Sequence, residues 1–149
     1  MMNAIRILGL DPGLRRTGWG VIAVEGSRLA WVAHGVIVPD DKAPFAERLL
    51  HLFDGITAII EAHAPHEAAV EETFVNSNPQ STLKLGHARA PAMIAPAKAG
   101  LMVAEYAARE VKKCVVGTGA ADKTQVAFMI ARLLPAAGKP TQDAADALA

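Results

Sequence analysis

The first part of the chain alternates between short apolar runs and turn-forming residues. Residues 5–10 are mostly aliphatic and stop at the Asp-Pro-Gly of residues 11–13, which predicts a buried strand that ends in a tight turn. Residues 21–24 and 29–38 are rich in residues that favour strands, and the Glu-Gly-Ser of residues 25–27 between them is typical of a hairpin. Three strands with short connections should form an antiparallel meander.

The pattern then changes to a helical period. From Phe45 apolar residues recur every three or four positions until the chain reaches Pro65, which predicts a long amphipathic helix. Residues 68–70 follow as a short buried strand that runs into Glu71 and Glu72. A strand, a helix and a strand imply a right-handed crossover onto a parallel neighbour. The expected fold class is therefore α/β, with a mixed sheet.

Several helices are expected in the second half. Asn78 and Pro79 form a good helix start, and Pro91 and Pro96 should kink or stop the helix because each removes a hydrogen bond. A strand is expected at residues 101–105.

Three further patterns belong to the last third of the chain. A helix is expected at residues 106–113, and Glu105 is spaced to pair with Arg109. Asp122 and Gln125 resemble a capping pair for a following helix.

Composition fits one soluble domain spanning residues 1–149. Hydrophobic residues make up 52% and charged residues 20% of the chain, and no apolar run approaches the roughly 20 residues of a membrane span. The start lacks the order of a signal peptide, so we expect a cytoplasmic protein. The single cysteine, Cys114, lies in an apolar run and is expected to be a buried small residue rather than a nucleophile.

Charge is balanced in total but unevenly distributed. Residues 40–72 contain eight acidic and two basic residues, whereas residues 84–139 contain nine basic and three acidic residues. This asymmetry suggests a face that could meet a polyanion, and the alternative is a set of solvated helix faces.

Acidic residues stand where chemistry is expected. Asp11 ends the first strand, and Glu71 or Glu72 ends a strand that should lie beside it, although side-chain alternation allows only one of the two to point toward Asp11. Near the end of the chain, Asp143 and Asp146 are spaced to share one face of a helix. Such a carboxylate cluster needs a countercharge, and all-oxygen ligands suit Mg²⁺ or Mn²⁺.

Two further residues carry open alternatives. Phe74, in a polar loop, could stack on a nucleobase or fill the core beneath the loop. Lys123 stands in the first turn of a helix, where the helix dipole disfavours a cation, so it is either there to meet an anion or is a plain surface lysine.

Taken together, these segments resemble the ribonuclease-H-like superfamily and, within it, the RuvC family of Holliday junction resolvases. The resemblance runs over essentially the whole chain and rests on the order and spacing of these segments: GLDPGLRRTGWGV, AVEETF, LKLGHARA, EYAAREVKK, VVGTGAADKTQV and DAADALA. It implies a five-stranded mixed sheet, an antiparallel three-strand meander plus parallel strands, with helices on both faces. It also implies a homodimer that resolves four-way DNA junctions by paired nicks in recombination and repair, with a branch-migration complex as partner.

The resemblance also implies particular residue roles. It places the catalytic and metal-binding acids at Asp11, Glu71, Asp143 and Asp146, choosing Glu71 over Glu72, and suggests two Mg²⁺ or Mn²⁺ ions per active site. Base stacking near the junction is implied for Phe74, and contact with the DNA backbone for Lys112 and Lys123.

The resemblance has two departures. Pro91 and Pro96 stand where relatives continue an Ala-rich helix that supports the dimer, and the chain stops where relatives continue into a basic tail. The alternatives to a resolvase are a non-catalytic junction-binding module, a related ribonuclease-H-like nuclease acting on RNA, and a nucleotide-binding domain of the actin and sugar-kinase type. The last of these has an Asp-x-Gly turn of the same kind but needs a second domain.

Overall fold

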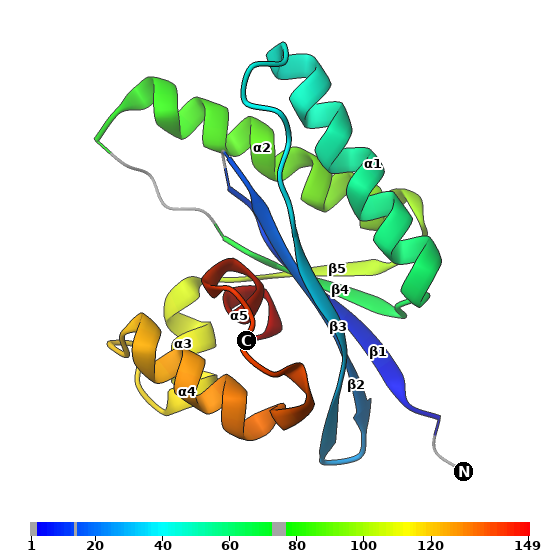
Figure 1. Cartoon of the computed structure of the whole chain (residues 1–149), viewed down its shortest axis with the longest axis vertical. Helices are drawn as coiled ribbons and strands as arrows, with labels where there is room; N and C mark the ends of the chain where they lie inside the picture. Colours follow the sequence, from blue (N-terminus) through cyan, green and yellow to red (C-terminus); the bar gives the residue numbers. More distant parts are fainter. Residues whose placement is uncertain (1–2, 14, 73–76) are drawn as a thin grey trace.

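A five-stranded mixed sheet forms the centre of the molecule (Figure 1). The computed structural model describes residues 3–13, 15–72 and 77–149. The order across the sheet is β3-β2-β1-β4-β5, in which β1 to β3 are antiparallel and β1, β4 and β5 are parallel. The strands are β1 (Ile5–Asp11), β2 (Thr17–Glu25), β3 (Arg28–Ile37), β4 (Glu67–Glu71) and β5 (Met102–Tyr106). This arrangement confirms the expected meander and the parallel crossover.

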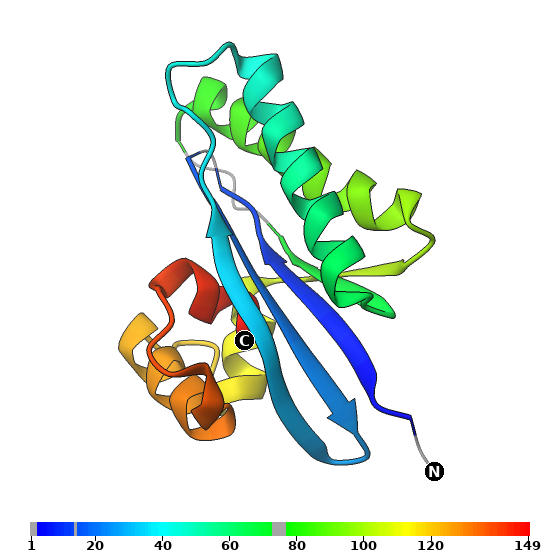
Figure 2. The ribbon, with the colours of Figure 1, turned by 45° about the vertical axis from the view of Figure 1, so that its right-hand side comes forward.

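Two long helices cover one face of the sheet (Figures 1 and 2). They are α1 (Phe45–His63) and α2 (Pro79–Lys98). The main core lies beneath them and contains fully buried side chains such as Leu8, Ile56 and Val70. Because side chains alternate along a strand, burying Leu8 and Leu10 on this face directs Gly9 and Asp11 to the other.

Three shorter helices lie on the opposite face (Figure 1). They are α3 (Ala108–Val116), α4 (Lys123–Leu133) and α5 (Gln142–Leu148), with a 3-10 turn at Pro135–Ala137 before α5. A second, smaller core joins α4 to the end of α5 through Val126, Ile130 and Leu148. Helices on both faces confirm the predicted fold class. No helix in the described part of the chain is long and apolar enough to cross a membrane.

The predicted helix starts are confirmed in atomic detail. The Asn78 side-chain oxygen accepts hydrogen bonds from the backbone N–H groups of Gln80 and Ser81, at 3.0 and 3.2 Å. At the start of α4, the backbone N–H of Gln125 donates to the Asp122 carboxylate at 2.8 Å, and the Gln125 side-chain oxygen accepts from the backbone N–H of Asp122 at 2.9 Å. This reciprocal pair fixes the position of Lys123, the first residue of α4.

The prolines do not stop α2, contrary to one expectation. The helix continues through Pro91 and Pro96 to Lys98, and both prolines are buried. Ala92 and Ala95 pack into the main core beside them. Tertiary packing therefore holds a helix that its local sequence would interrupt.

Two further expectations are wrong. Cys114 is exposed rather than buried, because its side chain borders an open cavity beside α3 instead of packing into a core. Glu105 forms an ion pair with Arg89 of α2 instead of Arg109, so it ties β5 to the helix above it.

Candidate active site

Two acidic residues end neighbouring parallel strands. Asp11 is the last residue of β1 and Glu71 the last of β4, and the register pairs Leu10 with Val70 immediately before them. The two carboxyl groups therefore meet at the carboxyl edge of the sheet, as the topology predicted. Glu72 lies beyond the strand and is exposed, so it is Glu71 that faces Asp11.

Two glycines allow α5 to lie directly on this face of the sheet. A Cβ atom at Gly9 would overlap the backbone carbonyl oxygen of Ala147, and one at Gly18 would overlap that of Asp143. Since Gly18 pairs with Asp11 across β1 and β2, this close approach brings the first turn of α5 beside Asp11. Asp143 and Asp146 thus join the acids of the two strands.

The electrostatics show that Asp11 is the centre of the cluster. Burial is the main cause that raises its pKa, from 3.8 to about 8. The charges of Glu71, Asp146 and Asp143 raise it further, and a hydrogen bond that Asp11 donates to the Glu71 carboxylate adds to the effect. The Asp11 carboxyl is therefore neutral over much of the neutral pH range when no cation compensates the other acids.

Burial also raises the pKa of Glu71 and of Asp146. The negative charge of Asp146 adds to the rise at Glu71, and that of Asp143 adds to the rise at Asp146. Lys112 of α3 and Lys123 of α4 act in the opposite direction on both acids. The two lysines that the sequence singled out therefore stand on the Glu71 and Asp146 side of the cluster.

Asp143 has a different neighbour, which the sequence analysis did not anticipate. Arg16, in the connection between β1 and β2, places its Nε atom 3.7 Å from the Asp143 carboxylate. Local sequence patterns do not predict this ion pair, because Arg16 and Asp143 come from opposite ends of the chain. A basic residue just after the Asp-Pro-Gly turn was the available signal.

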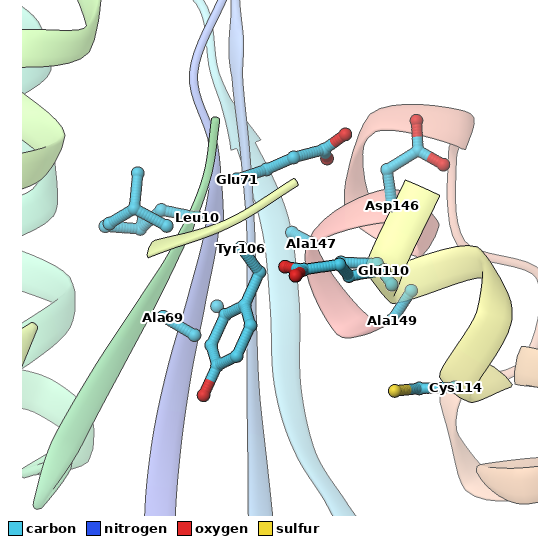
Figure 3. A pocket seen from close by; sticks show the side chains of 12 residues that line it. Leu10, Ala69, Glu71, Tyr106, Glu110, Cys114, Asp146, Ala147 and Ala149 are labelled. Carbon is cyan, nitrogen blue, oxygen red and sulfur yellow. The ribbon is translucent and has the colours of Figure 1, made fainter. Parts of the chain in front are cut away.

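A cavity of about 210 Å³ opens beside the acids. Glu71 and Asp146 stand at one end, Tyr106 and Ala69 lie along the sheet, and Cys114 stands at the far end (Figure 3). Its other walls are chiefly apolar. The space therefore continues from the carboxylates toward the gap between β5 and α3.

The donor set suits a hard divalent cation, since Asp11, Glu71, Asp143 and Asp146 supply oxygen atoms only. Within the described residues, however, no three His, Cys, Asp or Glu side chains are already arranged to hold a metal ion. Instead, Asp11 is hydrogen-bonded to Glu71, and Asp143 is paired with Arg16. Phe74, the remaining predicted site residue, lies outside the described residues.

The fold and the site together indicate the class of protein. It is an α/β domain of the ribonuclease-H-like type, with acidic residues at two strand ends and on the last helix. A profile of the family described as crossover junction endodeoxyribonuclease RuvC matches residues 7–149. The chain belongs to this family, which makes it a nuclease that hydrolyses DNA. Membership implies a requirement for a divalent metal ion and sets aside the actin and sugar-kinase alternative.

Individual relatives agree with the profile. RuvC of Caulobacter vibrioides is 75% identical over 153 residues, covering 100% of this chain and 90% of the relative, and RuvC of Maricaulis maris is 64% identical over 149 residues, covering 100% and 89%. Among solved structures, T. thermophilus RuvC in complex with a Holliday junction substrate has a TM-score of 0.89 at 29% identity. That match covers 97% of this chain and 88% of the other.

Proposed function

We propose that this protein resolves four-way DNA junctions, hydrolysing one phosphodiester bond in each of two symmetric strands and leaving 5′-phosphate and 3′-hydroxyl ends. The observation that carries the proposal is the gathering of four carboxylates at one edge of the sheet, where burial and, after it, the neighbouring charges raise the pKa of Asp11 to about 8. Such a cluster is costly to fold around without cations. The chain belongs to a family of junction nucleases, which favours a catalytic role for the cluster.

In this proposal Asp11, Glu71, Asp143 and Asp146 hold two Mg²⁺ or Mn²⁺ ions. Bound ions of this kind lower the pKa of an attacking water and stabilise the departing oxygen. The chain contributes oxygen donors from β1, β4 and α5, which are regular elements held by the core. A cation held by these acids would offset their mutual repulsion.

Lys112 and Lys123 are proposed to hold the DNA backbone. Both lie near enough to Glu71 and Asp146 to lower the pKa of each. A phosphate bound by these lysines would therefore be brought beside the acids. Lys123 is further held at the start of α4 by the Asp122 cap. Phe74, between β4 and α2, is assigned to base stacking next to the junction.

A homodimer is part of the proposal, because two symmetric strands require two active sites. Helix α2 leaves Leu83 and Ile94 largely exposed, at 63% and 55%, which supports a contact with a second copy along this helix. A branch-migration complex is proposed as a further partner. We further propose that the protein acts in the cytoplasm, where bacterial DNA lies.

Cleavage of synthetic DNA tests this function. Labelled four-way junction, linear duplex and RNA–DNA hybrid are incubated with the protein in Mg²⁺, in Mn²⁺ and in EDTA, and the mass of the assembly is measured in parallel. We expect paired nicks on the junction alone, only with metal, from a dimer. Tight junction binding without nicks in either metal would contradict the proposal and favour a non-catalytic binding module, whereas cleavage of the hybrid would favour a nuclease acting on RNA.

A further inference from the structure

Arg16 is the cation closest to the acids on the Asp143 side of the site. It lies in the short connection that follows Asp11, and two residues later Gly18 packs directly against Asp143. The connection that carries Arg16 is therefore fixed at both ends. It follows β1, which ends in the proposed metal ligand Asp11, and it leads into β2, which contacts the proposed metal ligand Asp143. Its Nε atom lies 3.7 Å from the Asp143 carboxylate.

This ion pair is weakly held. The Arg16 side chain is 58% exposed and that of Asp143 is 34% exposed. Water screens pairs of this kind, so they add little to stability and exchange readily. The pair is therefore not needed to hold the fold together, since the contact of Gly18 with Asp143 already fixes α5 on β2.

The same carboxylate cannot serve a guanidinium and a divalent cation equally well. While Arg16 engages Asp143, one of the four proposed ligands is turned to a monovalent partner. A divalent cation at the cluster would bind the Asp143 carboxylate more strongly than Arg16 does, because it also neutralises the neighbouring acids. The guanidinium is then free beside the acids, where the proposed function puts a DNA phosphate.

We propose that Arg16 is a positioning residue with two partners, Asp143 in the metal-free protein and a phosphate oxygen of the cleaved strand once metal holds Asp143. This inference rests on the proposed metal site. The planar fork of donors on a guanidinium matches a phosphate in a way that a lysine does not. Arg16 acts at Asp143, whereas Lys112 and Lys123 act at Glu71 and Asp146. The strand would thus be held from both sides of the acids.

Metal binding without DNA gives the first test. Mn²⁺ is titrated by calorimetry, at low ionic strength, into the wild-type protein and into Arg16→Ala, Arg15→Ala and Asp143→Asn. Arg15→Ala is the matched control. It removes the same charge from the same connection, and Arg15 forms no ion pair among the described residues. We expect Arg16→Ala to bind Mn²⁺ roughly two- to fivefold more tightly than the wild type, and Arg15→Ala to stay close to it.

Junction affinity gives the second test. In EDTA, where Arg16 faces Asp143, Arg16→Ala should bind the junction about as tightly as Arg15→Ala does. In Mn²⁺, the junction concentration that gives half-maximal cleavage should rise about tenfold for Arg16→Ala, because a charge-assisted contact with phosphate is lost. Arg16→Lys should recover part of this loss, since it keeps the charge but not the fork.

The outcomes separate this inference from the function beneath it. If Asp143→Asn weakens Mn²⁺ binding while Arg16→Ala leaves it unchanged, the metal site stands and the competition by Arg16 is overturned. If Arg16→Ala weakens junction binding equally in EDTA and in Mn²⁺, Arg16 contacts DNA whether or not metal is bound. The proposed change of partner is then overturned. If Asp143→Asn binds Mn²⁺ as the wild type does, the proposed ligand set fails and the inference fails with it.

Discussion

At the scale of single residues, Asp11 links the stability of the fold to pH and to cations. Its pKa is 3.8 in an unperturbed chain and about 8 in the folded protein. Between these values the folded state holds a proton that the unfolded state releases, so stability falls as the pH rises through this window. Burial and the neighbouring acids therefore make the metal-free site a source of instability at neutral and higher pH.

Asp11→Asn should remove this effect. In EDTA we expect the melting temperature of the variant to match that of the wild type near pH 4 and to exceed it increasingly up to about pH 8, by on the order of 10 °C. The window spans about four pH units, each pKa unit corresponds to about 1.4 kcal/mol, and about 1 kcal/mol corresponds to roughly 3 °C for a chain of this size. Thermal unfolding across this range measures the difference. Asp41→Asn, at an exposed position outside the cluster, is the control and should show no such trend. A difference between Asp11→Asn and the wild type that does not depend on pH would refute this reading of Asp11.

Some residues of the candidate site could be predicted from the sequence, and others could not. Asp11 and one of two glutamates were predictable, because acids that end neighbouring parallel strands must meet. The choice of Glu71 depends on the exact end of β4, and the sequence pattern alone does not fix strand ends to one residue. The pairing of Arg16 with Asp143 depends on how α5 folds back onto the sheet, so it was not predictable from local patterns.

At the scale of elements, the seating of α5 decides whether the site exists. This helix has only seven residues, Gln142–Leu148, and is too short to be stable by itself. Gly18 lets it lie on β2 with Asp143 beside Asp11. The sequence indicated two acids on one helix face, but not that the glycines of the neighbouring strands provide their seat.

Gly18→Ala should displace α5. The added methyl group would meet the backbone of Asp143, so we expect a loss of about 1–3 kcal/mol in the free energy of unfolding. Junction cleavage should fall strongly, because the two aspartates of α5 move with the helix. Urea unfolding and a cleavage assay measure the two effects.

Gly86→Ala is the matched control for this substitution. Gly86 lies within α2, and a Cβ atom there meets nothing within 4 Å. The change should stabilise the protein by roughly 0.5–1 kcal/mol, since alanine favours a helix more than glycine does. Wild-type stability and cleavage in Gly18→Ala would contradict the role given to this glycine.

Helix α2 shows the limit of local rules at this scale. Two internal prolines predicted a break, yet the helix runs unbroken from Pro79 to Lys98. The alanines around the prolines are buried against the main core. Packing along the helix outweighs the missing hydrogen bonds, and packing is what a single sequence reveals least.

At the scale of the whole molecule, the structure shows where the acidic and basic segments of the chain lie. The basic segment, residues 84–139, includes α3 and α4, which carry Lys112 and Lys123 toward the acids. The acidic segment, residues 40–72, includes α1 on the opposite face. Although the net charge of the chain is zero, Lys112 and Lys123 therefore offer positive charge to DNA beside the acids.

The salt dependence of junction binding tests this surface. Lys112→Ala and Lys123→Ala should each weaken binding and lower the slope of log affinity against log salt by about 1, because each releases about one counterion fewer. Lys42→Ala serves as the control, since Lys42 is exposed in the acidic segment. Fluorescence anisotropy in EDTA, from low to moderate salt, gives the slopes. Unchanged slopes for both lysine variants would place the DNA elsewhere.

The most direct test of the whole account compares the wild type with Asp11→Asn on a labelled four-way junction in Mg²⁺, measuring binding and cleavage on the same samples. Asparagine keeps the shape of the side chain and removes the charge that a cation needs. The account predicts near-complete loss of cleavage with junction binding retained, while the Asp41→Asn control cleaves as the wild type does. Normal cleavage by Asp11→Asn would show that the carboxylate cluster is not the catalytic centre.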